Sequence, residues 1–252
     1  MSTLFISDLH LEAARPEIGA QFMAFLEGKA RQADALYILG DLFEYWIGDD
    51  DPSAYYAEMK AAIRGLVDAG VPVYFMHGNR DFMIGERFAA DTGVTLLEDP
   101  HLAEFHEDKV LLCHGDTLCT DDVEYQKVRA MTRNPAWQSM MLDKSVEERL
   151  AFADQSRQQS MARSMASADE IMDVNHDAVV AAMREHGVDI LLHGHTHRPA
   201  VHPMHVNGRR ANRIVLGDWY EQGSVVEWDE DGPRLETLPR QASRAGSAGG
   251  PE

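Results

Sequence analysis

Short apolar runs that end abruptly in Gly, Asp, Asn or His recur along the whole chain. Runs of three to six residues with such ends predict buried strands and not helices. Open α/β sheets bind their ligands at the ends of such strands, so the polar groups there are candidates for a site. The runs span residues 4–6, 35–39, 71–76, 110–113, 190–192 and 214–216, and the groups that follow are Asp8 with His10, Asp41, Asn79, His114, His195 with His197, and Asp218.

Segments with helical periodicity separate several of these runs. Asn175 is suited to cap the start of one helix and Gly187 its end. The alternation of strands and helices predicts an α/β layered domain. Residues 224–228 and 234–238 are expected to complete it as antiparallel strands. The apolar helix faces are marked by Ile18, Phe22, Phe25 and Leu26, by Met59, Ile63, Leu66 and Val67, and by Val179, Val180 and Met183.

Residues 121–170 interrupt this rhythm, because they contain no strand-like run and are rich in Met, Gln, Ser, Arg and Glu. Asn134 followed by Pro135 is expected to interrupt one helix. Ser145 with Glu148 fits a capping box that opens another. We interpret the segment as a helical cap inserted into one domain at residues 1–239. The composition of residues 240–252 predicts a disordered tail.

Composition argues against several classes of function. Lys and Arg total 23 against 42 Asp and Glu, so the net charge of −19 would repel a nucleic-acid backbone. No apolar stretch approaches the roughly 18 residues of a membrane-spanning helix, and the first residues lack the features of an export signal. Cys113 and Cys119 are too few for a disulfide framework. We therefore expect a protein of the reducing cytoplasm.

The polar residues after five of the runs form a donor set for divalent metal ions. Imidazole, carboxylate and amide donors suit Mn²⁺, Fe²⁺ or Zn²⁺. The two-residue spacing of Asp8 and His10 directs both side chains to one side of an extended backbone, and the same holds for His195 and His197. Taken singly, such a pair is more often a polar strand end. Taken together, the residues predict two ions that share a carboxylate, an arrangement that can hold a phosphate and activate a water.

As a set, these motifs resemble the calcineurin-like metallophosphoesterases. The resemblance covers about residues 1–239 and implies an α/β sandwich of two mixed sheets flanked by helices, with a dinuclear metal site at the strand ends. The matching residues are Asp8-x-His10, Gly40-Asp41, Gly78-Asn79, His114-Gly115 and Gly194-His195-x-His197.

One residue departs from the common pattern of the superfamily and points to a particular subfamily. Many members of that superfamily carry His after the Gly-Asn pair, but Arg80 follows Asn79 here. The stretches at residues 38–50, 78–81, 114–122, 194–200 and 216–219 resemble the UDP-2,3-diacylglucosamine diphosphatases of lipid A synthesis. That resemblance implies Mn²⁺-dependent hydrolysis of UDP-2,3-diacylglucosamine to UMP and 2,3-diacylglucosamine 1-phosphate. It also implies a peripheral position at the cytoplasmic face of the inner membrane, and attack at the uridine-side phosphorus.

By the same resemblance two Mn²⁺ ions would bind per chain. One would be held by Asp8, His10, Asp41 and His197, and the other by Asp41, Asn79, His114 and His195, with Asp41 bridging. Catalytic roles would fall to Asp41, Asn79, Arg80 and His195. Arg80 offers a bidentate, permanently charged fork to phosphate oxygens, although a salt bridge to Asp81 is an alternative. Substrate contacts would come from Asn79, Arg80, Asp122, Ser160, Ser164, Ser167 and His195.

The cap would explain how a lipid substrate binds. Its flexible apolar side chains suit irregular acyl chains, although any single Met could instead pack the cap against the body. Ser167 stands where relatives carry Lys, so phosphate binding is expected to be weaker unless Arg157 or Arg163 substitutes. The apolar mouth of the cap would touch the membrane surface. The apolar side chains are Met131, Met140, Met141, Leu142, Leu150, Phe152, Met161 and Met165.

Other polar residues are expected to have structural roles. Cys113 should pack in the core, and residues 49–51 are interpreted as a solvated loop. His77 and His193, which precede glycines at strand ends, could support the site from behind. The histidines without a paired partner are expected on the surface or in packing, and these are His101, His106, His176, His186, His202 and His205.

Two alternatives to a lipid diphosphatase stay open. One is a phosphoesterase of another soluble substrate, against which Arg80 and the cap argue. The other is a non-catalytic scaffold that keeps the fold for protein interaction. Such a scaffold would be free to lose metal donors, whereas this chain retains all seven.

Overall fold

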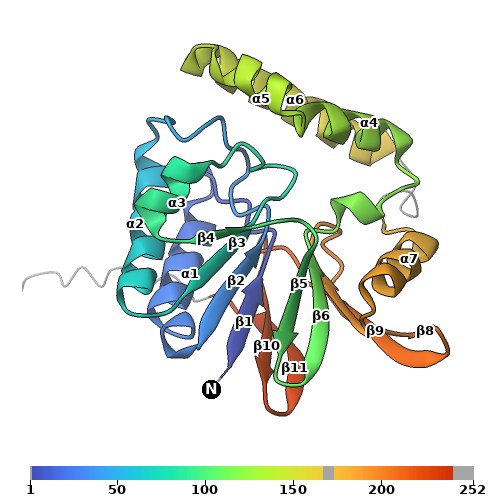
Figure 1. Cartoon of the computed structure of the whole chain (residues 1–252). Coiled ribbons are helices and arrows are strands. Elements are labelled where there is room, and N and C mark those ends of the chain that lie inside the picture. Colours follow the sequence, from blue (N-terminus) through green and yellow to red (C-terminus); the bar gives the residue numbers. More distant parts are fainter. Residues whose placement is uncertain (1, 167–172, 241–252) are drawn as a thin grey trace, which may run out of the picture.

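Two β-sheets pack face to face, helices cover both outer faces, and further helices stand over one end (Figure 1). The computed structural model describes residues 2–166 and 173–240, with side chains for all of these except residues 160–166. Each sheet contains both parallel and antiparallel neighbours. The predicted sandwich of two mixed sheets flanked by helices is confirmed.

The first sheet has the strand order β11-β10-β1-β2-β3-β4. Its parallel part is β1 (Thr3–Ile6), β2 (Ala35–Leu39), β3 (Val73–Met76) and β4 (Thr95–Leu97). β10 (Gly223–Asp229) pairs antiparallel with β1 and with β11 (Gly232–Leu238), which confirms the antiparallel strands predicted near the end of the chain.

The second sheet has the order β5-β6-β7-β9-β8. In its centre, β6 (Asp108–Cys113), β7 (Ile190–His193) and β9 (Arg209–Val215) run parallel to one another. β5 (His101–Phe105) and β8 (Ala200–Val206) are antiparallel edge strands. The carboxyl ends of β6 and β7 therefore point the same way, as those of β1, β2 and β3 do in the first sheet.

The core forms in layers because neighbouring residues of a strand face opposite sides of a sheet. Leu4 and Ile6 of β1 pack on the helix side of the first sheet, whereas Phe5 between them lies in the cluster between the sheets. Leu112 of β6 also lies between the sheets, and Leu111 packs on the outer side against α7. Strands that are buried on both faces consist of continuous apolar runs, which is why they could be predicted from the sequence.

The outer layers are helical. α1 (Pro16–Glu27), α2 (Ala54–Asp68) and α3 (Glu86–Thr92) cover the first sheet. α7 (His176–His186) covers the second. The Asn175 side chain accepts a hydrogen bond from the Ala178 N–H, and Gly187 ends α7 in the left-handed region, so both predicted caps of α7 are confirmed.

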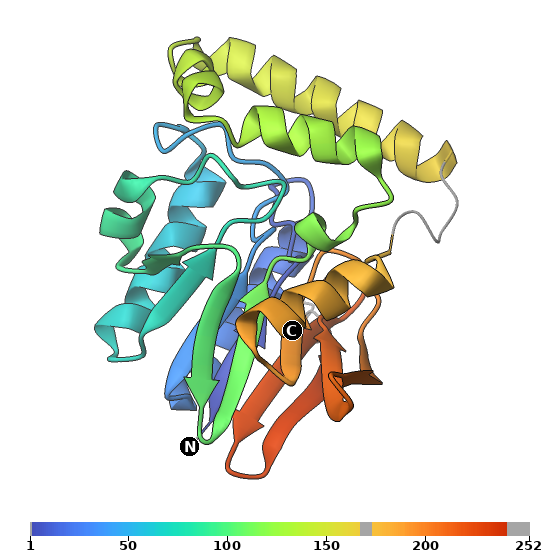
Figure 2. The ribbon, with the colours of Figure 1, turned by 45° about the vertical axis from the view of Figure 1, so that its right-hand side comes forward.

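Three helices stand over the carboxyl ends of the central strands (Figure 1, Figure 2): α4 (Val123–Thr132), α5 (Pro135–Leu142) and α6 (Val146–Ala166). Asn134 caps α5, and Ser145 with Glu148 forms the predicted capping box at the start of α6. The division of the chain into body, cap and tail stays a prediction, and tail residues 241–252 lie outside the described part. Among the helices of the described residues, none combines the length and the hydropathy that a membrane span requires.

Candidate metal centre and adjoining cavity

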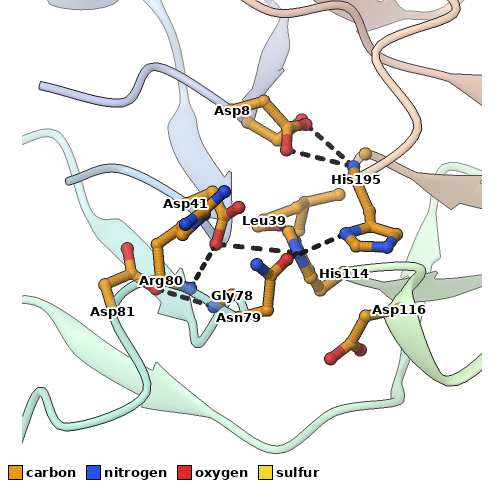
Figure 3. Close-up of polar contacts among 12 residues, drawn as sticks. Asp8, Leu39, Asp41, Gly78, Asn79, Arg80, Asp81, His114, Asp116 and His195 are labelled. Atoms are coloured by element: carbon orange, nitrogen blue, oxygen red, sulfur yellow. Dashed lines mark hydrogen bonds and ion pairs between the residues drawn. The ribbon is translucent and has the colours of Figure 1, made fainter. Parts of the chain in front are cut away.

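The predicted metal donors converge from both sheets. In Figure 3, Asp8, Asp41, Asn79, His114 and His195 turn toward one another at the ends of the strands. Backbone hydrogen bonds continue past the strands and fix the loops: the Asp8 N–H donates to the Gly40 carbonyl at 3.1 Å, and the Gly194 N–H donates to the His114 carbonyl at 2.9 Å. The site therefore lies across the open end of the sandwich.

One group of donors consists of Asp8, His10, Asp41 and His197. The Nε2 atoms of His10 and His197 lie 3.2 Å apart. His197 Nε2 is 3.4 Å from Asp8 Oδ1, and His10 Nε2 is 3.8 Å from Asp41 Oδ2. The ligand atoms of Asp8, His10 and His197 thus lie close together, as ligands of one cation would, and Asp41 adjoins them through His10.

A second group consists of Asp41, Asn79, His114 and His195. Asn79 Oδ1 is 3.0 Å from His114 Nε2 and 2.8 Å from His195 Nδ1. His114 Nε2 is 3.7 Å from Asp41 Oδ1. Asp41 therefore presents one carboxylate oxygen to each group, as a bridging ligand would, and Asp8 also offers an oxygen near Asp41 and His114.

Three histidines turn one ring nitrogen to the site and have a polar neighbour at the opposite nitrogen. His114 Nδ1 lies 2.9 Å from the Leu39 carbonyl oxygen, and His10 Nδ1 lies 2.9 Å from Glu44 Oε2. His197 Nδ1 lies 3.5 Å from Asp218 Oδ2. Such partners fix the tautomer and the ring orientation of metal-binding histidines. Asp218 follows an apolar run and was a candidate for the site on that ground, whereas nothing in the sequence marked Glu44 as a partner of a histidine.

The backbone at the donors is strained. Five of the seven donors have a backbone φ between +51° and +67°, a region that residues other than Gly rarely adopt. These five are Asp8, His10, Asp41, His195 and His197. Neighbouring glycines make room for them. A Cβ atom on Gly78 would collide with the Asp41 carboxylate, and one on Gly194 with that of Asp8. The absence of a side chain at these glycines thus leaves room for the carboxylates at the centre of the site.

The buried site holds several carboxylates and histidines whose charges act on one another. Burial alone would raise the pKa of Asp8, but the hydrogen bond and charge of His197 lower it below the usual value. Burial would lower the pKa of His114, yet Asp41, Asp116 and Asp8 raise it to about 9. His195 shows the opposite balance, because burial and the nearby His114 lower its pKa to about 4. The carboxylates thus attract positive charge, and this oxygen and nitrogen donor set without thiolate fits divalent cations.

Arg80 lies beside the donors. Its backbone N–H donates to Asp41 Oδ1 at 2.8 Å, and its side chain lines the cavity next to the site. Asp81, the alternative partner considered for Arg80, accepts hydrogen bonds from the N–H groups of Leu42 (2.8 Å) and Gly78 (2.7 Å). Asp81 therefore ties together the loops that follow β2 and β3.

A cavity of about 550 Å³ adjoins the metal donors and is lined from both the body and the cap. Polar lining includes Arg80, Asp122, Arg129, Arg133 and five of the seven donors, namely His10, Asp41, Asn79, His195 and His197. Apolar lining includes Trp46, Phe82, Val128, Met131, Trp137, Met141 and Phe152. Among the apolar cap residues singled out in the sequence, Met131, Met141 and Phe152 line this cavity. Met140 and Leu142 are about half exposed, and the side chains of Met161 and Met165 lie outside the described structure.

The remaining predicted substrate contacts are only partly described. Asp122 lines the cavity and caps α4 by accepting a hydrogen bond from the Tyr125 N–H at 3.0 Å. Ser160 and Ser164 belong to α6, but their side chains are outside the described structure, as is that of Arg163. Ser167 lies outside the described residues altogether. Arg157, considered as a substitute for the missing Lys, is engaged by Glu12 and Glu44.

The interpretation of residues 49–51 as a solvated loop is wrong for Asp49. Its carboxylate accepts hydrogen bonds from Trp46 Nε1 (2.9 Å) and from the N–H groups of Gly85 and Phe88 (both 3.0 Å). Asp49 thereby anchors the start of α3, whose own N-cap residue is Gly85 and has no side chain. Asp50 is bound as well, because it forms an ion pair with Arg149 of α6.

The other structural expectations agree with the described contacts. His77 Nε2 contacts the Ile84 carbonyl oxygen at 2.8 Å, and His193 bridges the Gly194 carbonyl and Arg213, so both support loops at the site. Cys113 is buried in the cluster under α7. The unpaired histidines are exposed or half-buried, namely His101, His106, His176, His186, His202 and His205.

Comparison with known proteins places this geometry in a family. Residues 1–199 match the family model described as calcineurin-like phosphoesterase. A UDP-2,3-diacylglucosamine hydrolase of Stenotrophomonas maltophilia (strain R551-3) is 51% identical over 248 residues, which cover 96% of this chain and all of that protein. The protein of that name from Enterobacter sp. (strain 638) is 52% identical over 95% of this chain and all of its own. A solved structure of an archaeal phosphodiesterase aligns with a TM-score of 0.48 and 14% identity over 94% of this chain and 100% of its own.

Proposed function

Because this chain belongs to the calcineurin-like phosphoesterase family, we propose that it hydrolyses the pyrophosphate bond of UDP-2,3-diacylglucosamine. Water adds across the bond to give UMP and 2,3-diacylglucosamine 1-phosphate. The observation that carries the proposal is the cavity, in which buried metal donors adjoin apolar side chains of the cap helices. Full-length relatives at about half identity carry the name of this hydrolase.

We propose two Mn²⁺ ions as the cofactor, held by the two donor groups that share Asp41. The support is the chemistry of the donors: carboxylate, amide and imidazole ligands suit Mn²⁺, although Zn²⁺ and Fe²⁺ would accept them too. When bound, two such metal ions polarise a phosphoryl oxygen and lower the pKa of a water molecule.

The chain's own residues would bind and orient the diphosphate. Arg80 presents a planar, permanently charged fork that matches phosphate oxygens. Asn79 and His195 line the same cavity, and the N–H of Arg80 fixes the Asp41 carboxylate between the two donor groups. On a chain with net charge −19, the bound cations, Arg80 and the other arginines that line the cavity would supply the positive charge that the substrate meets.

We further propose that the protein works peripherally at the cytoplasmic face of the inner membrane. The diacyl part of the substrate would lie along Val128, Met131 and Phe152 of the cap. Support comes from apolar side chains that the cap leaves to solvent, since Val123 is 56% exposed and Met140 is 51% exposed. Such side chains can insert among lipid headgroups without a membrane-spanning helix.

The test is hydrolysis of UDP-2,3-diacylglucosamine by the purified protein, with Mn²⁺ or with a chelator, and with products identified by mass spectrometry. UMP and 2,3-diacylglucosamine 1-phosphate should appear only with metal. In ¹⁸O water the label should enter UMP. Arg80→Ala should lower turnover at least about a hundredfold, of the order reported for loss of one charge-stabilising donor, while both ions remain bound.

Two comparisons separate the alternatives. UDP-N-acetylglucosamine, which has the same diphosphate but no long acyl chains, should be a poor substrate, and rapid turnover of it would favour a phosphoesterase of soluble nucleotides. Metal analysis of Asp41→Ala addresses the scaffold alternative. A scaffold would bind little metal in either form, whereas the proposed enzyme should bind two ions and lose them with Asp41.

A further inference from the structure

Arg157 of the cap helix α6 reaches down to two carboxylates of the body. Its Nη1 and Nη2 atoms donate to the two oxygens of Glu12 at 3.0 and 3.2 Å, and its Nε atom lies 3.1 Å from Glu44 Oε1. The side chains of Glu12 and Glu44 are only 9% and 7% exposed. Three donors of one guanidinium thus serve two buried acids, a geometry that Lys could not reproduce.

Glu44 connects this contact to the metal centre. Its second oxygen, Oε2, lies 2.9 Å from His10 Nδ1, and His10 Nε2 faces Asp41 and His197. Glu44 therefore divides its two oxygens between the cap and a metal donor. A carboxylate in this position sets the orientation and basicity of the histidine.

The charges indicate why the cap contact matters for Glu44 more than for Glu12. Glu12 has a second partner in the body, since Arg15 Nε lies 3.4 Å from its Oε1. Glu44 is buried, so loss of Arg157 would leave one of its oxygens in a poorly hydrated position. Its carboxylate could then turn away from His10 toward water or toward Arg80, whose charge also acts on it.

From these contacts we propose that Arg157 is a positioning residue which, through Glu44, couples the seating of α6 on the body to the orientation of His10. Closure of the cap and binding of the ion held by His10 would then favour each other, because a coupling between two sites is reciprocal. The inference rests on the metal-binding part of the proposed function, and it does not depend on the identity of the substrate.

Arg149 provides a matched control on the same helix. It also joins α6 to the body, with Nη1 donating to the Ile47 carbonyl and to Asp50 Oδ1, each at 2.7 Å. Neither of these two partners is a metal donor or is bonded to one. Loss of Arg149 should therefore loosen α6 without affecting His10.

The first experiment titrates each metal-free variant with Mn²⁺ by calorimetry. Arg157→Ala and Glu44→Gln should each weaken one of the two sites about tenfold or more, which is the usual effect of removing a partner of a metal ligand. Arg149→Ala should leave both affinities unchanged. The double variant Arg157→Ala with Glu44→Gln should bind no more weakly than Glu44→Gln alone, and Arg157→Lys should recover part of the loss.

The second experiment measures hydrogen exchange of the backbone amides at residues 146–159. Mn²⁺ should slow exchange there in the wild type and in Arg149→Ala, but not in Arg157→Ala or Glu44→Gln. Wild-type Mn²⁺ affinity in a folded Arg157→Ala variant would overturn the coupling and leave the proposed function intact. Equal weakening by Arg149→Ala would overturn it too, since any loosening of the cap would then suffice. A wild type that binds no Mn²⁺ would contradict the metal part of the proposed function itself.

Discussion

Gly78 illustrates how closely packed single residues are at the metal centre. A Cβ atom at this position would collide with the carboxylate and the backbone nitrogen of Asp41, the residue that faces both donor groups. We therefore expect Gly78→Ala to displace Asp41, to weaken Mn²⁺ binding at least tenfold, and to destabilise the fold by about 1–3 kcal/mol, as overpacking commonly does.

Gly65 is the matched control, because it lies within α2 and a Cβ atom there would meet open space. Gly65→Ala should leave Mn²⁺ binding unchanged and stabilise the protein by about 0.5–1 kcal/mol, the gain expected for Ala over Gly inside a helix. Metal titration and urea unfolding of both variants provide the comparison. Normal Mn²⁺ binding by Gly78→Ala would contradict the packing argument.

At the residue scale the sequence was informative about donors and silent about their partners. All seven candidate donors could be named and the structure brings them together, because each follows an apolar run and belongs to a residue type that binds metal. Glu44 carries no comparable mark: its contact with His10 forms only when the loops after β1 and β2 lie side by side. Arg157 is 145 positions from Glu12, and nothing in residue spacing connects them.

At the scale of elements, strands with mostly buried residues could be predicted from the sequence, and strands with many exposed residues could not. Strands β1, β2, β3 and β7 are apolar nearly throughout, β6 is apolar from Val110 on, and all five were predicted. Strands β5 and β8 lie at sheet edges with exposed residues such as Glu104 and His202, and β4 has only two apolar residues, so none of these produced an apolar run. Helix α3 was missed because the group that anchors its start, Asp49, lies far away in the sequence.

The role of Asp49 gives a prediction about α3. Asp49→Ala would leave the N–H groups of Trp46, Gly85 and Phe88 without their acceptor, and each unsatisfied buried donor costs about 1–3 kcal/mol. We expect a loss of about 3 kcal/mol in the free energy of unfolding, measured in urea. Asp68→Ala, which breaks an exposed ion pair with Arg64, should cost at most about 0.5 kcal/mol. Similar small losses for both would mean that α3 does not depend on Asp49.

For the whole molecule, the metal centre joins the two sheets at their open end. Asp8, Asp41 and Asn79 follow strands of the first sheet, and His114 and His195 follow strands of the second, so bound ions would cross-link the layers. A ligand at one hundred times its Kd stabilises the folded state by about 2.7 kcal/mol. For a chain of this length that corresponds to a rise of roughly 5–10 °C in Tm.

Thermal unfolding with and without Mn²⁺ tests this cross-link. The wild type should show the rise in Tm, and a chelator should reverse it. Asp41→Ala should show little rise, because both donor groups lose their shared carboxylate. A similar rise in Asp41→Ala would place the stabilising ions elsewhere on the acidic surface.

A second link at this scale ties an early part of the chain to its last strands. Lys29 Nζ, just after α1, lies 2.6 Å from Glu227 of β10 and 2.7 Å from Glu236 of β11. The hydrogen bond from Lys29 lowers the pKa of Glu227 below 4.5. Burial would lower the pKa of Lys29, but its bonds to Glu227 and Glu236 raise it above 10.5.

The direction of these shifts sets the pH range in which the link stabilises the fold. A carboxylate whose pKa is lowered by folding stabilises the fold above its unfolded-state pKa, and this stabilisation is lost as the pH falls through its folded-state pKa. A lysine whose pKa is raised by folding stabilises the fold at lower pH, and this stabilisation is lost as the pH rises through its folded-state pKa. Lys29→Met should therefore cost up to about 1 kcal/mol at pH 7, since the pair is partly exposed, and almost nothing at pH 2–3. Lys127→Met, which breaks an exposed pair with Glu124, is the control and should change little at either pH. The measurement is urea unfolding in the presence of a chelator, which keeps metal binding out of the comparison. A pH-independent cost for Lys29→Met would mean that packing of the aliphatic part of its side chain, and not its charge, holds this segment against β10 and β11.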